Sequence, residues 1–398
     1  MSETTNERWN DLDAVRALAL LLGVALHGVM SFMTPRIWLV GDTVTSTGAD
    51  VLFYVIHMFR MTTFFVLAGF FARLMMQKKG VAKFISNRLK RVALPLLVFW
   101  PIVLAAIIAV AIIANAPGPG AHAALAPPPA LSAATFPLTH LWFLYDLLLL
   151  YAGAVAIKLV TDAGQFGGRL GRLLDGVVGV LTRLDLITLA LAAPVAIAFS
   201  FDRTWMMWFG ITSPDTGLIP SVTPMAGFVT AFVFGWWLNR RTDLFRHLSA
   251  RWGLYALSAV AGTWWCLTDV GKTPSFTPVD GRDHLLYAVI YPLTSWCWAF
   301  FLIGFARVVL KKEHPMIRRL SDASYWIYII HVPVLLFFQY LVMKLNIPIE
   351  YKFGVVLFGT FGIGLSSYQM FVRYSFIGTI LNGRKRKIKA LQRQEALA

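Results

Sequence analysis

The chain has 398 residues, 58% of them hydrophobic and only 14% charged, with a formal net charge of +16. Soluble domains carry charge on about a quarter of their residues, so this composition excludes a soluble globular protein. The Lys and Arg residues alternate with long apolar runs, a pattern that orients a membrane protein among lipids and does not form a nucleic-acid-binding face. We therefore expect a multi-pass membrane protein with membrane lipids as partners and no nucleic acid.

Ten apolar segments alternate with polar connections along the chain. A helix of about 20 residues crosses the hydrocarbon core, and a helix pairs its interior backbone groups within its own segment. The expected helices are residues 14–33, 51–76, 92–114, 140–160, 186–202, 222–239, 252–268, 285–310, 323–345 and 352–380. The predicted fold class is all-α, a polytopic membrane protein with a single transmembrane domain over residues 1–398 and short cytoplasmic tails at 1–12 and 382–398.

The connections differ in their content of Lys and Arg, and this difference predicts the orientation. Basic residues crowd the connections that begin at Lys78, Arg169, Arg240 and Lys311, whereas intervening connections such as Thr34 to Asp50 are poor in them. Basic connections remain in the cytoplasm. Both termini are thus expected in the cytoplasm, with the helices in a bacterial inner membrane. The first segment is kept as a helix because it exceeds the roughly 7–15 apolar residues of a signal peptide.

Two polar side chains share one face of the first predicted helix. Arg16 and His27 are eleven residues apart, which is about three turns and places them about 16 Å apart along one groove. Titratable residues inside a membrane helix are costly, so each is a candidate for function. The alternative is structural: Arg16 snorkels near the helix end and pairs with Asp13, and His27 bonds a neighbouring helix.

Further titratable residues lie inside other predicted helices. His57 is expected level with His27, and Arg60 follows one turn deeper on the same face of the second helix. Asp146 lies at a similar depth in the fourth helix, and His331 lies near the middle of the ninth. A structural ion-pair network, such as Asp146 neutralising Arg60, would produce the same pattern.

Several familiar catalytic motifs are absent from the sequence. The chain has no P-loop, no H-E-x-x-H and no G-x-S-x-G. The stretch from Gly167 to Arg172 does not match G-x-G-x-x-G and is expected to be a basic segment at the membrane interface. No metal cofactor is expected.

Four segments of the chain resemble the acyltransferase 3 family of membrane proteins. In that family the first helix carries an Arg and a His separated by ten residues, and an R-x-x-R motif starts the third helix. The matching parts are Arg16 and His27, Arg88 and Arg91, the segment from His140 to Asp146, and the segment from Ser321 to His331. They span most of the chain. Residues 54–71 are most similar to the glucan biosynthesis protein C branch, which is associated with succinylation of periplasmic glucans.

The resemblance implies a membrane-embedded O-acyltransferase. It would move an acyl group, succinyl or acetyl, from cytoplasmic acyl-CoA to hydroxyl groups of a periplasmic glucan or another exported carbohydrate. Acyl-CoA is then the donor substrate, and Arg16, Arg88 and Arg91 are the candidates to bind its phosphates. His27 is the candidate base for the sugar hydroxyl, or it accepts the acyl group covalently, and the sequence leaves both mechanisms open.

The resemblance also gives roles to the other buried polar residues. Arg60, His57 or His331 would stabilise the oxyanion that forms on the thioester carbonyl. Asp13, beside Arg16, completes the set of catalytic candidates.

Aromatic and acidic residues are candidates for binding the substrate. Trp142 and Asp146 belong to the third of the resembling segments. Trp205 and Trp208 lie in an outer connection and would stack on sugar rings, although aromatic anchors at the membrane interface are the alternative.

Two functions from other classes remain open. A secondary transporter or polysaccharide exporter would use the same buried ionisable residues for protons or substrate. It would show inverted repeats and broken helices at matching positions, and the sequence has neither. A structural subunit would not need Arg16 and His27 on one face. The sequence does not predict the oligomeric state.

Overall fold

The computed structural model describes residues 9–115, 130–165, 167–311 and 314–382. Within these ranges the chain forms α-helices joined by loops and by short 3-10 and π-helical turns. Most of the predicted tails, at 1–12 and 382–398, lies outside the described residues.

The helices follow one another without a strand in the described ranges. In chain order they are α1 (Asn10–Val29), α2 (Thr47–Lys79), α3 (Val81–Arg88), α4 (Leu94–Ala114), α5 (Trp142–Ala163), α6 (Gly167–Arg183), α7 (Ile187–Phe201), α8 (Val222–Arg240), α9 (Leu244–Ala250), α10 (Trp252–Val270), α11 (Leu285–Val309), α12 (Pro315–Val342), α13 (Ile349–Ser367) and α14 (Phe376–Asn382). The turns are the 3-10 helices η1 (Met30–Phe32), η3 (Thr139–Leu141) and η4 (Met207–Phe209), and the π-helices η2 (Leu89–Ala93) and η5 (Tyr368–Val372).

The all-α membrane fold predicted from the sequence is confirmed. Each predicted segment overlaps a helix of the structure, and these helices are α1, α2, α4, α5, α7, α8, α10, α11, α12 and α13. By length and composition, seven helical stretches in the described part of the chain can cross a membrane, or eight if the bent pair of α6 and α7 forms one span. The ten spans and the cytoplasmic position of both termini stay predictions.

One predicted boundary was wrong. The apolar segment 352–380 is not a single helix, because α13 ends at Ser367 and α14 begins separately at Phe376 after the π-helical turn η5. The hydropathy of the segment continues through this turn, so composition could not locate the break.

The stretch from Gly167 to Arg172 begins an amphipathic helix. It forms the first part of α6, which is bent by 107° from α7. Asp175 of α6 pairs with Arg240 at the end of α8 over 2.8 Å, which ties α6 to the bundle. A basic amphipathic helix that turns away from the bundle axis suits the predicted interfacial position.

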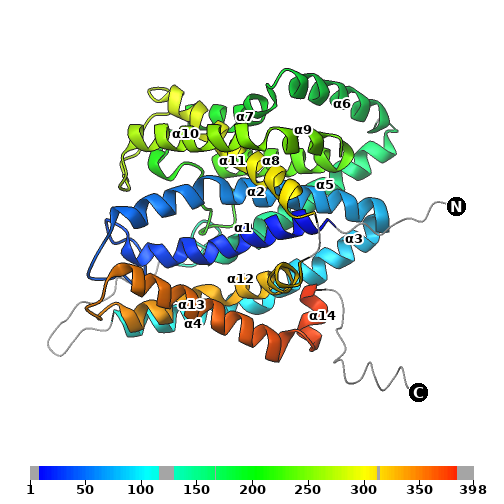
Figure 1. The fold of residues 1–398 in the computed structure, drawn as a ribbon. Coiled ribbons are helices and arrows are strands. Elements are labelled where there is room, and N and C mark those ends of the chain that lie inside the picture. The colour runs from blue at the N-terminus through cyan, green and yellow to red at the C-terminus, as the bar shows by residue number, and fades with distance from the viewer. Residues whose placement is uncertain (1–8, 116–129, 166, 312–313, 383–398) are drawn as a thin grey trace, which may run out of the picture.

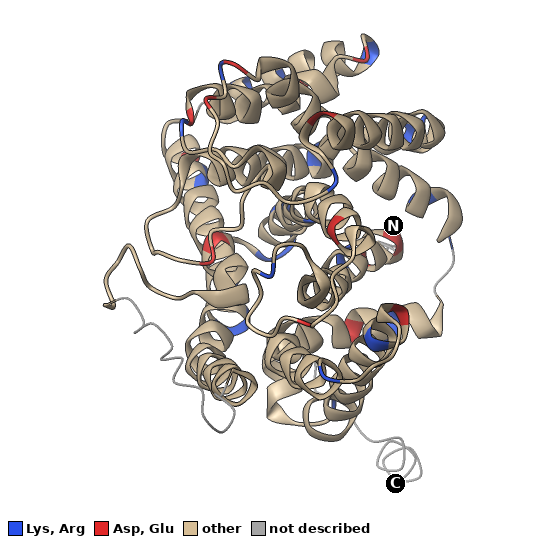
Figure 2. Cartoon of the chain, turned by 90° about the vertical axis from the view of Figure 1, so that its left-hand side faces the viewer, with Lys and Arg blue, Asp and Glu red and all other residues tan. Residues whose placement is uncertain are grey.

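The helices lie side by side in a bundle with α1 and α2 at its centre (Figure 1). The helices α7, α8, α10 and α11 lie on one side of this central pair, and α4, α12 and α13 lie on the other. The start of α1, the end of α2 at Lys79, α3 and α14 share one end, which we call the basic end. The loop from Met33 to Ser46 lies at the opposite end, which we call the loop end and which faces the viewer in Figure 2.

The closest contact between helices joins α2 to α8 through two glycines. A Cβ atom on Gly69 would overlap the backbone carbonyl of Phe232, and a Cβ atom on Gly235 would overlap the carbonyl of Val66. Small residues that let two backbones approach are a common way for membrane helices to associate, because lipid supplies no hydrophobic force between them. This contact fixes α2, and with it Arg60, against the rest of the bundle.

We predict that Gly235→Ala destabilises the folded protein by at least about 1–3 kcal/mol, because the added methyl group meets backbone that cannot move aside. Gly153→Ala on α5 is the matched control, since a Cβ atom there meets nothing within 4 Å. Thermal unfolding of both variants in detergent measures the difference. Equal melting temperatures for the two variants would contradict the packing described here.

Candidate functional site

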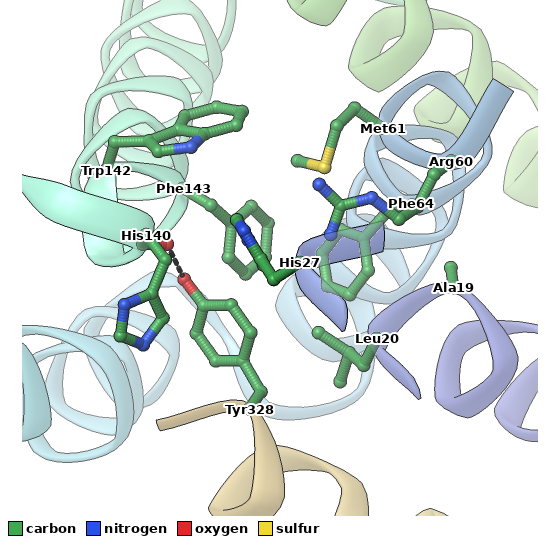
Figure 3. Close-up of a pocket in the computed structure, with 10 residues that line it drawn as sticks. All are labelled: Ala19, Leu20, His27, Arg60, Met61, Phe64, His140, Trp142, Phe143 and Tyr328. Carbon is green, nitrogen blue, oxygen red and sulfur yellow. Dashed lines mark hydrogen bonds between the residues drawn. The ribbon is translucent and has the colours of Figure 1, made fainter. Parts of the chain in front are cut away.

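A narrow cavity of about 20 Å³ lies inside the bundle between α1, α2, α5 and α12. Its lining combines titratable and aromatic side chains, and we call it the His27 cavity. The lining residues are Ala19, Leu20, His27, Arg60, Met61, Phe64, His140, Trp142, Phe143 and Tyr328. In Figure 3 the His27 ring lies between Arg60 and Met61 on one side and His140, Trp142 and Phe143 on the other.

One face of α1 joins the cavity to the basic end. Leu20 and His27 line the cavity, and Arg16 lies one turn before Leu20 on the same face. Gly23 lies between Leu20 and His27, and a Cβ atom at Gly23 would come within 2.5 Å of a terminal nitrogen of Arg60. The glycine therefore makes room for the Arg60 guanidinium one turn below His27.

Arg60 enters the cavity without a counter-charge. Its side chain is 7% exposed, its Nε is buried without a hydrogen-bond partner, and it forms no ion pair with a carboxylate of the described residues. The predicted alternative, a permanent pair with Asp146, is wrong for this structure. Asp146 is itself buried, and its Oδ2 has no hydrogen-bond partner among the described groups.

His57 lies one turn from Arg60 but belongs to a different environment. Its Nε2 hydrogen-bonds the carbonyl of Ile211 at 2.9 Å, and its ring stacks on Phe53 with centroids 5.3 Å apart. It is not among the residues that line the His27 cavity. Its ring is held by the loop before α8.

Two further histidines surround His27. The ring centroids of His27 and His331 are 5.3 Å apart, those of His140 and His331 are 4.8 Å apart, and those of His27 and His140 are 6.4 Å apart. The sequence analysis selected His331 but passed over His140, although His140 opens one of the resembling segments. The predicted helix 140–160 begins at His140, and nothing in the sequence placed this ring beside His27 and His331.

A tryptophan and a glutamine hold His27 from the loop end, and the sequence analysis selected neither. Trp38 stacks on the His27 ring with centroids 5.3 Å apart, and its Nε1–H donates to Oε1 of Gln339 at 2.8 Å. Nε2 of the fully buried Gln339 donates in turn to the carbonyls of His27 and Gly28. These carbonyls lie in the last turn of α1, where helical partners run out.

A buried ion pair fixes the loop that carries Trp38. Nζ of Lys352, at the start of α13, donates to both carboxylate oxygens of Asp42 at 2.8 and 2.9 Å. Lys352 is 1% exposed and Asp42 is fully buried. The Asp42 backbone N–H also donates to the carbonyl of Ser31, so the loop is joined to both α13 and the end of α1.

The tryptophans selected from the sequence fall into two groups. Trp142 lines the His27 cavity and stacks on Phe228. Trp205 and Trp208 are only 2% and 1% exposed, and Trp205 stacks on Phe199 with ring centroids 4.0 Å apart. The expectation that these two rings stack on a sugar is therefore corrected, because other aromatic side chains already occupy their surroundings. They are core residues and not interfacial anchors.

At the basic end, Arg16 and Arg88 contact one face of α2. Arg16 pairs with Asp13 at 3.0 Å, as its spacing predicted, and its guanidinium lies over the Phe71 ring. Arg88 donates to Sδ of Met75, one turn beyond Phe71, at 3.0 Å. The two guanidinium groups thus follow the same stripe of α2 that reaches Phe64 in the cavity.

Arg91 lies three residues after Arg88, in the π-helical turn η2. The hydroxyl of Tyr325 on α12 donates to the Arg91 carbonyl at 2.7 Å, and Tyr328 lies one turn further along α12 in the cavity wall. Turns of π-helix occur preferentially at functional sites. Polar groups therefore extend from the R-x-x-R segment along α12 to the cavity.

Comparison with known proteins gives two results. The family model described as "Acyltransferase domain" matches residues 9–368. The chain is also 30% identical over 102 residues to the Glucans biosynthesis protein C of Shigella dysenteriae serotype 1 (strain Sd197) and of Escherichia coli (strain SMS-3-5 / SECEC). Each match covers 26% of this chain and 26% of the relative, so only about a quarter of the relatives' length is matched. No solved structure matches the chain.

We predict that Lys352→Met destabilises the protein by about 3–5 kcal/mol, because it leaves the Asp42 carboxylate buried without its counter-charge. The double variant Asp42→Asn with Lys352→Met should recover most of this loss, since it leaves no buried charge. Thermal unfolding in detergent compares the two. If the double variant were no more stable than the single one, the pair would not be the buried contact described here.

Proposed function

Because the chain belongs to the acyltransferase family whose model matches residues 9–368, we propose that it moves an acyl group from acyl-CoA to a carbohydrate hydroxyl on the other side of the bacterial inner membrane. The observation that carries this proposal is the single face of α1 that links Arg16 at the basic end to His27 in the cavity. The relatives named for glucan biosynthesis support a glucan as the acceptor.

The donor would enter from the basic end, which we assign to the cytoplasm. Arg16, Arg88 and Arg91 would bind the phosphates of CoA, for which guanidinium groups supply several donors and a permanent charge. The flexible arm of CoA would then lie along the faces of α1 and α2 toward the cavity. About 16 Å of helix separates Arg16 from His27, so the phosphates and the thioester occupy different ends of the site.

His27 would act as the base. Its nitrogen removes the proton of the acceptor hydroxyl, and the hydroxyl oxygen attacks the thioester carbonyl carbon. The oxyanion collapses, the carbon–sulfur bond breaks, and the thiolate of CoA takes the proton back from His27, so the ring ends as it began. A covalent acyl group on His27 would use the same ring and would be visible as a burst of free CoA.

Arg60 would give the cavity its preference for one acyl group. A buried guanidinium without a counter-charge is costly, so the cavity favours a substrate that brings an anion to it. The distal carboxylate of a succinyl group is such an anion, and Arg can hold it in a two-pronged contact. The oxyanion of the reaction is the competing ligand, and it forms from every acyl donor.

We predict that the purified protein transfers the acyl group of acyl-CoA to a glucan and that His27→Ala abolishes transfer while the protein remains folded, because a base acts in the transition state. Arg88→Ala should chiefly raise KM for acyl-CoA, because a phosphate contact mostly stabilises ground-state binding. His284→Ala and Arg246→Ala, in loops and helices away from the cavity, are the matched controls. Near-normal turnover by His27→Ala would remove the proposed mechanism, and glucan movement across vesicles without acyl-CoA would favour a transporter.

We predict that Arg60→Gln lowers transfer from succinyl-CoA at least tenfold more than transfer from acetyl-CoA. Gly23→Ala should act in the same direction, because its methyl group displaces the end of Arg60 while leaving the helix intact. Gly354→Ala on α13, where a Cβ atom meets nothing within 4 Å, is the control. Equal losses with both donors would assign Arg60 to the oxyanion and end the selectivity proposal.

A further inference from the structure

Three histidine rings from three elements meet beside the cavity, and the proposed reaction uses only one of them as a base. His27 comes from α1, His140 from η3 and His331 from α12. His331 is 1% exposed and His140 is 8% exposed. The burial of His140 and His331 next to the proposed base has to be explained, because buried polar groups without partners are costly.

Backbone carbonyls determine which nitrogen carries the proton on two of these rings. Nδ1 of His331 lies 2.6 Å from the Tyr328 carbonyl, and Nε2 of His140 lies 3.1 Å from the Ile329 carbonyl. A carbonyl oxygen can only accept, so both of these nitrogens must be N–H donors. In a neutral imidazole the other nitrogen then holds a lone pair. These lone pairs are on Nε2 of His331 and Nδ1 of His140.

The lone-pair nitrogens of His331 and His140 have no hydrogen-bond partner among the described residues, and the nearby ring that could donate a proton to them is His27. Nε2 of His331, Nδ1 of His140 and Nδ1 of His27 are all buried and make no hydrogen bond within the described residues. Two acceptors and one ring nitrogen that can carry a proton therefore share one small volume. The two rings form no hydrogen bond with each other in this structure. A hydrogen bond between two imidazoles sets the ring centres about 5 Å apart, and the His27 and His331 centroids are 5.3 Å apart, so a rotation of the rings without a shift of the helices would join them.

We propose that His331 accepts the Nδ1–H of His27 and so holds His27 in the tautomer whose Nε2 has a free lone pair for the acceptor hydroxyl. His140 supports this arrangement by packing against His331 and offering a second acceptor. Both are positioning residues for the base. The inference rests on the proposed function, because it explains how that base is kept competent.

The surroundings of His27 suit a neutral acceptor better than a carboxylate. The titratable groups that face it are His331 and Tyr328 from α12, His140 from η3, and Arg60 and His57 from α2. A carboxylate in this position would pair with Arg60 and remove the charge that the cavity keeps free. A neutral imidazole orients His27 and shares the positive charge that forms on it, without taking Arg60 from the substrate.

The test compares three replacements of His331 in the full-length protein. His331→Leu removes the acceptor. We expect kcat to fall by about 10²–10⁴, the range that a positioned general base contributes, with KM for donor and acceptor nearly unchanged. His331→Gln can place an oxygen where Nε2 was, and it should retain at least tenfold more activity than His331→Leu. Phe337→Leu, a lipid-facing change on α12, is the control.

His331→Glu separates positioning from contact with the substrate. A carboxylate accepts the His27 N–H but repels an oxyanion. The comparison uses acetyl-CoA, whose acyl group brings no carboxylate to Arg60, so that pairing of the new Glu with Arg60 does not affect donor binding. With this donor the Glu variant should be more active than the Leu variant if His331 positions His27. A folded Glu variant that is less active with acetyl-CoA than the Leu variant would overturn the proposal, and so would full activity of His331→Leu. If His331→Glu does not fold, the comparison of Gln with Leu decides. The proposed function fails separately, through activity of His27→Ala.

Discussion

Arg60 carries a positive charge into the interior of a membrane helix bundle where no carboxylate of the described residues meets it. Hydrocarbon cannot solvate such a charge, so the protein must supply the surroundings that keep the side chain in place. It does so with space: Gly23 on α1 leaves room for the guanidinium, and the close glycine contact between α2 and α8 holds the helix that carries it. Gly23 and Arg60 thus place the guanidinium in the cavity beside His27.

The loop end differs from the cavity, because there a network of buried polar groups is paired. Gln339 connects Trp38 to the last carbonyls of α1, and Lys352 holds Asp42 in the same loop. A buried polar network is rigid when all its hydrogen bonds are formed, whereas an unpaired buried group is costly and is stabilised when a ligand pairs with it. His27 lies at the boundary between the two regions, stacked on the fixed Trp38 ring and open to a cavity whose charge is unpaired.

The sequence predicted the features that depend on position along one helix and missed those that depend on contact between helices. The face shared by Arg16 and His27 follows from helical periodicity, and the Arg16–Asp13 pair follows from their spacing. Which side chains meet across α2 and α5 does not follow from the sequence, so the predicted pair of Asp146 with Arg60 was wrong. Trp38 and Gln339 are 301 residues apart, so no local pattern could join them.

The roles of the tryptophans also depend on contacts between distant parts of the chain, which the sequence does not reveal. A tryptophan in an outer connection can be a sugar platform, an interfacial anchor or a core residue, and its sequence neighbours are alike in all three cases. Trp205 and Trp208 became core residues because Phe199, Phe53 and Tyr287 surround them, whereas Trp38 was drawn to His27 by a hydrogen bond to Gln339. Only the fold distinguishes these outcomes.

The size of the cavity argues for the kind of molecule that crosses the membrane. A volume of about 20 Å³ holds little more than one water molecule, and the side chains around it are aromatic rings packed between helices. A sugar chain would require α1, α2, α5 and α12 to separate around the cavity. A thin, flexible arm requires only that rings such as Phe64 and Tyr328 turn aside. The packing beside His27 therefore suits a thin acyl chain better than a sugar chain.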